Sequence, residues 1–471
     1  MIHARTALFS AFAAALALAA SGCSAPPGFQ ERSTEGAASL PQDWQAPALK
    51  GSAASAQDAW WRDLGDAQLT GLIENALRDS HDVRIAIANL EAARAYAKQA
   101  GADLYPEVDL QGDGVRGKSR STTTNAVSRP QYARPIANAS WEIDFWGKAR
   151  QTRAAALAEA DESFWAVRAA RLSLAGSIAR QYIGWLADLQ SLEAAQDSLE
   201  TMERTLQITR GKAALGTATP VDVASAESDA ETQRAAVSSL RLSVEEHEHA
   251  LALLTAQPSL RLTRPANLEL PCPAVREGIP SELLQNRPDV REAEAALRSA
   301  SASVAVAYAA FFPSISLTGY AGTQSRTLGG LFGGSIWSLG LSLDLPVFDF
   351  GRRTARYEQT QANEKAALEA YRRAAESAYS DVRDALSGTA ALEQVEKSRK
   401  AARDSAERAL KQTLDRFRLG TDSFLTLLTA QRTLNAATQS LVSAHADRLY
   451  SFVSLNEALG AGSAVPEAKN R

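Results

Sequence analysis

The chain has 471 residues and carries 50 Lys and Arg against 54 Asp and Glu, which gives a formal net charge of −4. This near balance argues against the strongly basic surface with which proteins bind nucleic acid phosphates. Beyond Gly22, no apolar stretch approaches the roughly 20 residues that a membrane-spanning helix needs, so the sequence predicts no such helix.

Sequence motifs for catalysis and for bound cofactors are missing. The sequence contains no phosphate-binding loop, no recognisable pairing of nucleophile and base, and no metal-ligand spacing. His247 and His249 lie two positions apart, and such residues point to different faces of a helix. We therefore predict that the protein is not an enzyme and that it holds no metal or cofactor.

The first residues have the pattern of an export signal. Arg5 precedes an apolar stretch from Ala7 to Ala20, and small residues lead to Cys23. This end resembles a bacterial lipoprotein signal, in which the cysteine is lipidated and becomes the mature N-terminus. Ser24 then favours sorting to the outer membrane. The alternative is an ordinary signal peptide that happens to meet a cysteine.

We divide the chain into a signal segment (1–22), a lipidated tether (23–60), a first structural repeat (61–260), a Pro-rich linker (261–280), a second repeat (281–460) and a tail (461–471). The tether is rich in Ala, Ser, Gly and Pro, a composition typical of a flexible linker. Cys272 lies in the Pro-rich linker, where we expect an inert thiol.

The two repeats follow from matching segments roughly 205 residues apart, a distance that indicates two copies of one large unit. The sequence Asp-Val-Arg occurs at 82–84 and 289–291, and Leu-Gly-Thr occurs at 215–217 and 419–421. Each copy begins with a predicted helix, from Asp66 to Leu104 and from Pro280 to Phe311, that ends at a proline.

Alternating strands follow that helix in each copy. In the second copy Trp337, Leu339, Leu341 and Leu343 alternate with polar or small residues, and Ala137 to Phe145 alternate in the first. Such strands fit a membrane barrel, while a soluble two-sided sheet is the alternative. Four strands per chain are too few to close a barrel, so the sequence predicts an oligomer. The loops 112–135 and 321–335 would face outside.

A long Ala-rich helix comes next in both copies. No proline interrupts residues 136–219 or 347–465, so helices of roughly 65 residues are permitted. Each helix should end at the Leu-Gly-Thr sequence, where Gly216 or Gly420 stops it and the chain turns into a return helix.

This order of elements resembles the outer membrane factor family, the TolC-like and OprM-like channels of efflux systems, and especially its efflux lipoproteins of the NodT type. The segments that carry the resemblance are Ile279–Arg291, Trp141–Gly147, Leu345–Arg352 and Leu419–Arg432. It implies a mainly α fold with long α-helical hairpins that form a periplasmic tunnel, plus four β-strands per chain in a trimeric 12-stranded barrel. It also implies a lipid-anchored channel in the outer membrane that acts with a periplasmic adaptor and an inner-membrane pump of the RND type.

The same resemblance assigns roles at the two turns. Adaptor docking falls on Leu215, Gly216 and Thr217 and on Leu419, Gly420 and Thr421. Glycine also admits the close approach of a partner chain. The plainer interpretation is that these residues only form the turns between helices.

The narrowest part of the tunnel maps beyond the second turn. An apolar ring falls on Leu425, and Thr426 and Thr429 stand where relatives often carry aspartates. At the repeat spacing Thr426 pairs with Asp222, which could supply an acidic ring from the first copy. The competing interpretation makes Asp222 a solvated helix residue.

Two other functions remain open on the sequence. The chain could be the outer-membrane channel of a type I protein-secretion system, which uses the same fold. It could also be a periplasmic adaptor or a structural coiled-coil lipoprotein, which would lack the four strands. The sequence does not predict the cargo.

Overall fold

The structure is a computed structural model that describes residues 59–120, 123, 126–273 and 287–462. The predicted signal segment, Cys23, nearly all of the tether, the end of the Pro-rich linker and residues 463–471 lie outside the described residues. The chain divides into two units. A strand-bearing unit contains Ala92–Asp161 and Ala293–Arg372, and a helical unit contains Glu162–Glu292 with the described parts of Leu40–Glu91 and Arg373–Arg471.

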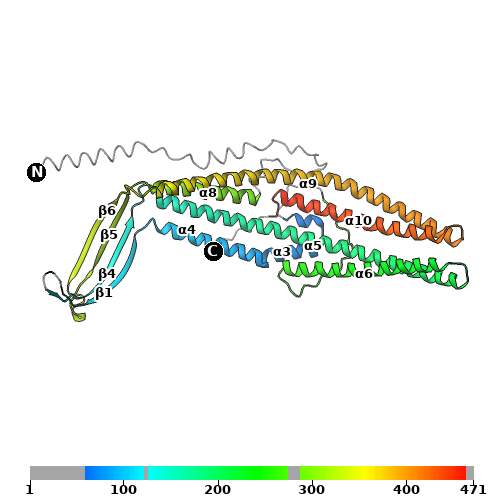
Figure 1. Cartoon of the computed structure of the whole chain (residues 1–471), viewed down its shortest axis with the longest axis horizontal. Helices are drawn as coiled ribbons and strands as arrows, with labels where there is room; N and C mark the ends of the chain where they lie inside the picture. The colour runs from blue at the N-terminus through cyan, green and yellow to red at the C-terminus, as the bar shows by residue number, and fades with distance from the viewer. Residues whose placement is uncertain (1–58, 121–122, 124–125, 274–286, 463–471) are drawn as a thin grey trace. The chain divides into compact units, whose positions relative to one another are not determined.

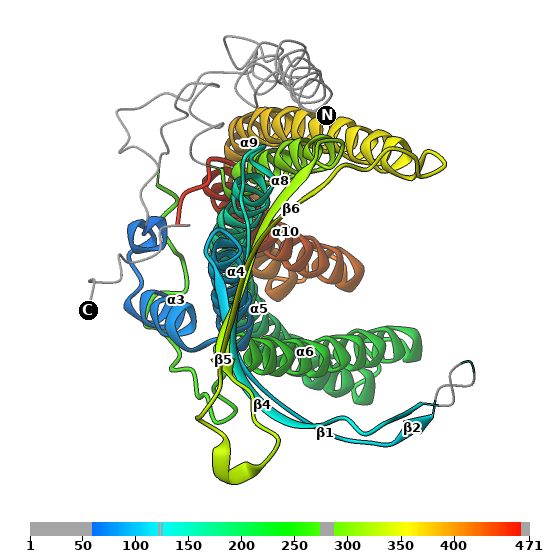
Figure 2. The ribbon, with the colours of Figure 1, turned by 90° about the vertical axis from the view of Figure 1, so that its left-hand side faces the viewer.

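The strand-bearing unit holds one four-stranded antiparallel sheet in the order β1-β4-β5-β6 (Figure 1). The strands are β1 (Glu107–Arg116), β4 (Gln131–Glu142), β5 (Ser314–Thr323) and β6 (Ser335–Asp344). The first copy therefore supplies β1 and β4, the second supplies β5 and β6, and β4 pairs with β5 between the copies. Figure 2 shows that the strands curve along their length. Both outer strands, β1 and β6, have a free edge within the described chain.

The strands run further than the sequence analysis expected. The predicted loop 112–135 is wrong in part, because β1 continues to Arg116 and β4 already begins at Gln131. A second short hairpin, β2 (Ser119–Arg120) and β3 (Val127–Ser128), prolongs this ribbon. The predicted loop 321–335 likewise gives its first residues to β5 and contains the 3-10 turn η2 (Leu328–Gly330). The pairing of β1 with β4 continues past the glycines at 112 and 114, although the alternation of polar and apolar residues ends there, since Val115 lies on the polar face.

The predicted strand to Phe145 ends earlier, at Glu142, because the next five residues form a turn that leads into α5, which begins at Lys148. Asp144 accepts hydrogen bonds from the N–H groups of Ala149 and Arg150, both at 3.0 Å, and so caps α5. Burial alone would raise the pKa of Asp144, but the bonds from Arg150 and Ala149 outweigh it and lower that pKa. Trp146 stacks on Phe312, with ring centroids 4.7 Å apart. The turn is thereby anchored to the second copy.

The helical unit repeats one pattern twice. The long helices α5 (Lys148–Ala214) and α9 (Arg352–Arg418) have 67 residues each, and the return helices α6 (Pro220–Leu254) and α10 (Phe424–Ala458) have 35 each. Figure 1 shows each long helix turning sharply into its return helix. The predicted long helices and the turns that end them are confirmed. Among the described residues, no helix combines the length and the apolar composition that crossing a membrane would take.

The predicted helix from Asp66 to Leu104 is two helices, α3 (Ala67–Asp79) and α4 (His81–Ala102), after the 3-10 turn η1 (Trp60–Leu64). They are separated at Ser80, whose ψ of 141° is extended rather than helical. Asp66 caps α3 through the N–H of Leu69 at 2.8 Å. In the second copy α8 (Pro288–Ala309) starts at a proline, which suits a first helical position, while the predicted start at Pro280 lies outside the described residues.

The core of the helical unit lies where α5, α9 and α10 meet. Its largest buried side chains include Tyr182 and Trp185 of α5, Leu386 of α9 and Phe452 of α10. Each buried side chain of this size contributes roughly 1.5–3 kcal/mol of hydrophobic stabilisation. Arg180 lies at the edge of this core, where its guanidinium donates two hydrogen bonds to Glu457, at 2.6 and 2.8 Å. This pairing ties the first copy to the second.

Candidate functional site

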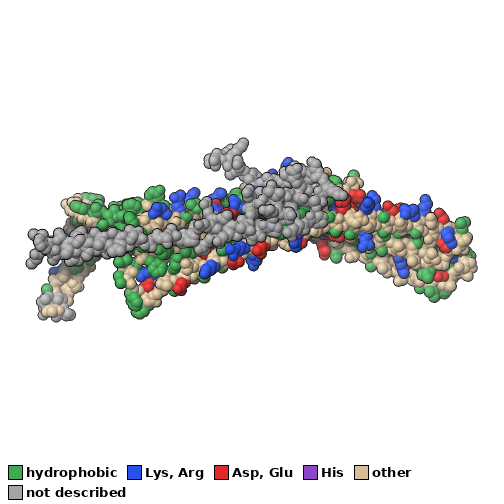
Figure 3. All heavy atoms as spheres, turned by 90° about the horizontal axis from the view of Figure 1, so that it is seen from above, with side chains coloured by type: hydrophobic (Ala, Val, Ile, Leu, Met, Phe, Trp, Pro, Cys, Tyr) green, Lys and Arg blue, Asp and Glu red, His purple; other side chains and the backbone are tan. Residues whose placement is uncertain are grey.

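The four strands present two chemically different faces. Residues paired across strands lie on the same face, so the register groups Leu110 with Ala137 and Ala321, and Ala321 with Trp337. This apolar face also carries Val108, Trp141, Ile315, Leu317, Leu339, Leu341 and Leu343. Most of its large side chains are exposed. Hydrophobic side chains gather over the strands in Figure 3, while charged ones lie mostly along the helices.

Polar contacts occupy the other face of the same sheet. Arg134 donates to Asp113 at 2.6 Å, and the amide of Asn138 donates to Asp109 at 3.2 Å. Tyr320 and Ser338 continue this face across β5 and β6. In a single chain both the apolar face and the polar face are exposed to solvent. A wall between lipid and an aqueous lumen requires a sheet with these two faces. A packed soluble sheet would have covered the apolar face.

The two hairpin turns have the same geometry. Gly216 and Gly420 adopt positive φ values of 73° and 77°, a conformation that favours glycine. In the first turn the N–H of Thr217 donates to Lys212 at 2.9 Å, and in the second that of Thr421 donates to Arg416 at 3.0 Å. Leu215 and Leu419 project outward, 81% and 79% exposed. Each turn thus offers a leucine and an open glycine to a partner.

The return helices begin with matching caps that differ in charge. Thr219 accepts from the N–H of Asp222 at 3.2 Å, and the Asp222 carboxylate accepts from the N–H and the hydroxyl of Thr219, at 2.8 and 2.7 Å. These two bonds hold the pKa of Asp222 below its usual value. In the second copy Ser423 accepts from the N–H of Thr426 at 3.1 Å, without a carboxylate.

One exposed stripe of α10 carries the residues assigned to the constriction. Leu425 is 70% exposed, although it lies beside the buried Leu427 and Leu428. Thr426 and Thr429 are exposed as well, and the Thr429 hydroxyl donates to the carbonyl of Leu425 at 2.8 Å. Leu425 therefore contributes little to packing within one chain. The structure brings the three residues together on α10 and places Asp222 at the equivalent end of α6.

Sequence reasoning missed the contacts that join the two hairpins. Arg432 of α10 forms an ion pair with Asp229 of α6, with Nε 3.2 Å from Oδ2. The Asp229 side chain is only 9% exposed, against 59% for Arg432. Asn435 donates to Ser198 of α5 at 2.6 Å. Asp229 lies among buried alanines of α6, which could have indicated a buried ion pair. Its partner, Arg432, belongs to the other repeat, and the sequence does not show which residue it is.

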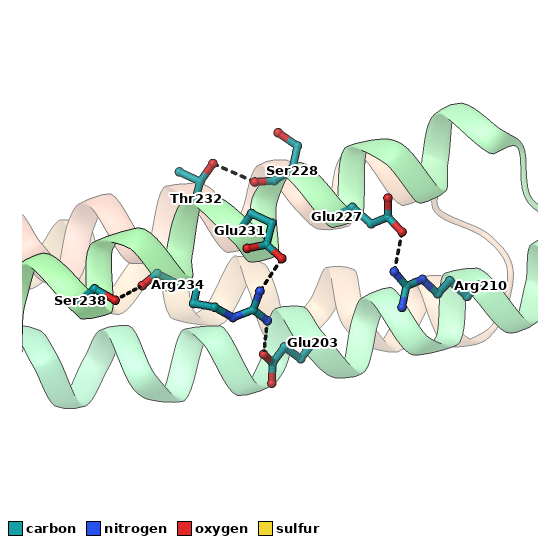
Figure 4. A network of polar contacts seen from close by, with 8 residues as sticks. All are labelled: Glu203, Arg210, Glu227, Ser228, Glu231, Thr232, Arg234 and Ser238. Carbon is teal, nitrogen blue, oxygen red and sulfur yellow. Dashed lines mark hydrogen bonds and ion pairs between the residues drawn. The ribbon is translucent and has the colours of Figure 1, made fainter.

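Ion pairs within the first hairpin are of another kind. Figure 4 shows Arg234 of α6 between Glu231 of the same helix and Glu203 of α5, and Arg210 of α5 facing Glu227 of α6. All of these side chains are exposed, so water screens each pair and the pairs add little to stability. They favour the register of the two helices and do not form a site.

The remaining candidates add no reactive centre. Cys272 is half-buried, and burial raises the pKa of its thiol, which fits the predicted inert role. The part of the chain that the structure describes contains no group of three or more His, Cys, Asp or Glu placed to hold a metal.

Comparison with known proteins supports the same assignment. A family model described as outer membrane efflux protein matches residues 72–257 and 279–461. The probable efflux pump outer membrane protein TtgC of Pseudomonas putida is 32% identical over 450 residues, which cover 94% of this chain and 93% of TtgC. The outer membrane protein OprJ of Pseudomonas aeruginosa is 31% identical over 471 residues, 97% of each protein.

Solved structures resemble the chain throughout. The outer-membrane channel OprN has a TM-score of 0.83 at 27% identity, over 91% of this chain and 96% of OprN. The open state of the Neisseria gonorrhoeae MtrE outer membrane channel has a TM-score of 0.81 at 30% identity, over 90% of this chain and 96% of MtrE. The fold of the chain is therefore that of outer-membrane channels.

A two-faced sheet combined with two long helical hairpins defines a class of outer-membrane channel subunit whose four strands fit a trimeric barrel. The chain belongs to the outer membrane efflux protein family. It is the outer-membrane component of an efflux system, with a periplasmic helical tunnel, and it works with an adaptor and an inner-membrane pump. The family and these relatives are channels rather than enzymes.

Proposed function

We propose that three copies of the chain form one continuous channel that receives small molecules from a periplasmic adaptor and an inner-membrane pump of the RND type. The observation that supports this most strongly is the two-faced sheet, because its exposed apolar face and two free edges leave a single chain incomplete. Closing these edges against identical copies would give twelve strands, enough for an aqueous lumen.

Small-molecule cargo is proposed from the relatives. Among them are an antibiotic efflux pump outer membrane protein and a toluene efflux pump outer membrane protein, both of Pseudomonas putida. A strain lacking this chain should become more susceptible to antibiotics or solvents, and the full-length gene should restore resistance only where the pump and adaptor genes are intact. Unchanged susceptibility to every compound class would contradict the proposed cargo.

We propose that Cys23 is lipidated and holds the channel to the membrane. A Cys23→Ser variant should lack the lipid mass in intact-protein mass spectrometry and should retain the signal peptide or be cleaved elsewhere. The variant loses the lipid anchor, but the strands of the barrel still insert into the membrane, so the variant should still sediment with membranes. An unchanged mass between the wild type and Cys23→Ser, apart from the substitution, would show that Cys23 carries no lipid.

We propose that Asp222 lines the periplasmic opening. Asp222→Asn keeps an acceptor for the Thr219 N–H but removes the charge, so block of single-channel currents by divalent cations should weaken. Because the folded pKa of Asp222 is lowered, the wild-type carboxylate stays charged, and its cap stays formed, until the pH falls below the usual range near 4. The block should therefore persist at mildly acid pH.

Asp422 supplies the matched control for Asp222. It lies at the other turn, but Arg416 already pairs with it at 3.1 Å. Asp422→Asn should leave divalent block as in the wild type. If Asp222→Asn also leaves conductance and block unchanged, Asp222 is a capping residue only.

A further inference from the structure

The two hairpins of the sheet repeat one register. The pairing of β1 with β4 starts at Glu107 and Ser140, and the pairing of β5 with β6 starts at Ser314 and Asp344. Counted from these pairs, each position in the first copy has a counterpart in the second. β4 pairs with β5 inside the chain, but their counterparts, β6 and β1, lie at opposite edges of the sheet. The contact of β4 with β5 is therefore a template for the contact of β6 with β1 of another chain.

An aromatic stack accompanies the pairing of β4 with β5. Trp146, in the turn after β4, stacks on Phe312, which precedes β5, with ring centroids 4.7 Å apart. The indole Nε1 of Trp146 donates to the carbonyl of Pro313 at 2.7 Å. The N–H of Ile143 in the same turn donates to the carbonyl of Ile315 at 2.8 Å. Within the chain, the boundary between the copies is thus closed by stacked rings as well as by strand pairing.

The counterparts of these two rings are exposed. By the register of the hairpins, Phe350 corresponds to Trp146 and Tyr105 corresponds to Phe312. Phe350 is 92% exposed and Tyr105 is 71% exposed. Phe350 meets the ring of Phe348, with centroids 4.6 Å apart, but Phe348 is itself 75% exposed. Adjacent exposed aromatic rings of this kind mark an interaction surface.

The turn that presents Phe350 is strained. Phe350 has a positive φ of 55°, a value that residues with a Cβ rarely adopt. The Asp349 carboxylate holds the turn by accepting from the N–H groups of Gly351 and Arg353, at 3.2 and 3.1 Å. Trp146, which is packed within the chain, does not share the positive φ. Backbone strain persists where contacts determine it and clusters at functional sites, so a partner is expected at Phe350.

A cavity beside Tyr105 leaves room for such a partner. It measures about 760 Å³, and its counterpart beside Phe312 measures about 200 Å³. The smaller cavity is lined in part by residues 142–146, the turn that carries Trp146. Residues 346–350, the counterpart of that turn, are described by the structure but line no part of the larger cavity. Within one chain, the place beside Tyr105 therefore lacks the turn that the repeat would put there.

We propose that Phe350 of one chain packs on Tyr105 of the next, so that each boundary between chains repeats the stack of Trp146 on Phe312. This inference rests on the proposed function, in which three copies close one barrel, and it adds the residues that meet at each boundary. Both rings would leave water in this contact, and their burial would offset the strain at Phe350.

The same repeat predicts how β6 pairs with β1 of the next chain. Trp141 pairs with Leu317 between β4 and β5, so their counterparts, Leu345 and Leu110, would pair across the boundary. Both leucines are exposed in the single chain, 55% and 86%. Pairing them keeps the apolar face continuous from one chain to the next, whereas a shift of one residue would set apolar against polar side chains.

Alanine variants of the purified full-length trimer test the aromatic contact. Phe350→Ala and Tyr105→Ala should each lower the temperature at which the detergent-solubilised trimer dissociates, followed by native mass, by about 5 °C or more. The double variant should fall short of the sum of the two shifts, because both substitutions remove one contact. Phe332→Ala is the matched control. Phe332 is 84% exposed but lies between β5 and β6, so its loss should leave the temperature unchanged.

A cysteine pair tests the register. In Asp344→Cys/Gln111→Cys the two thiols should face each other across the boundary, as Ser140 faces Thr318 inside the chain. The two strands lie at opposite edges of one sheet, so this disulfide forms only between chains. Oxidation should give covalent trimers on a denaturing, non-reducing gel, and each single variant should give none. Ser342→Cys/Gln111→Cys, displaced by two residues, should crosslink far less.

Three results would overturn this inference while a conducting trimer leaves the proposed function standing. They are a Phe350→Ala trimer as stable as the wild type, additive shifts in the double alanine variant, and crosslinking by the displaced cysteine pair in place of the matched one. Wild-type protein that remains a single chain would overturn both the inference and the proposed function.

Discussion

Replacing both turn glycines should abolish efflux and leave the channel assembled. In a Gly216→Val/Gly420→Val variant, each β-branched side chain must enter a left-handed conformation, which costs roughly 1–2 kcal/mol per position. A Cβ added at either glycine meets no atom within 4 Å, so the substitution strains the turn but clashes with no neighbouring side chain. The added bulk and the altered turn would act on a docked adaptor. We expect antibiotic susceptibility to match that of the deletion strain, with adaptor no longer co-purifying.

Gly211 provides a matched control for the turn glycines. It lies in α5, shortly before the first turn, and a Cβ there also meets nothing within 4 Å, but its backbone is helical. Gly211→Val should therefore retain efflux. The docking role is wrong if the double turn variant, present at wild-type level in the outer membrane, still confers full resistance and still binds the adaptor.

Truncating Leu425 should widen the narrowest part of the channel. Because the side chain is 70% exposed within one chain, Leu425→Ala should change the free energy of unfolding by less than about 0.5 kcal/mol. Three copies of the side chain would otherwise form an apolar constriction, and such constrictions limit conduction. We expect single-channel conductance to rise on the order of twofold or more, with greater uptake of large antibiotics by cells.

Two other leucines show whether the position matters. Leu253, near the end of α6, is 79% exposed, so Leu253→Ala should alter neither stability nor conductance. Leu427 is buried beside Leu425, so Leu427→Ala should cost roughly 2–5 kcal/mol and lower the melting temperature without the same gain in conductance. Equal conductance in Leu425→Ala and the wild type would remove Leu425 from the constriction.

Much of this architecture is predictable from the sequence because the controlling signals are local. The alternation around Trp337 to Leu343 predicts a strand with one apolar face, and the absence of proline before Pro220 permits an uninterrupted 67-residue helix. Gly216 and Gly420 mark the turns, since few other residues adopt positive φ at low cost. Repetition then strengthens each of these predictions.

Features that depend on tertiary contacts were not predictable in the same way. The break between α3 and α4 at Ser80 has no proline or glycine to mark it in the sequence. Ser80 is buried at the end of α3, and this burial is visible only in the structure. The ion pair between Asp229 and Arg432 joins residues from different repeats. The pairing of β4 with β5, which joins the two copies in one sheet, is likewise set by the fold and not by spacing along the chain.

The central claim is that the chain is a channel subunit that becomes complete only as an oligomer. The most direct measurement is the current through planar bilayers exposed to the purified full-length protein, with its native mass determined on the same sample. We predict discrete conductance steps from a species with the mass of three chains. Folded protein that remains a single chain, or a trimer that never conducts even as the Leu425→Ala variant, would contradict the claim.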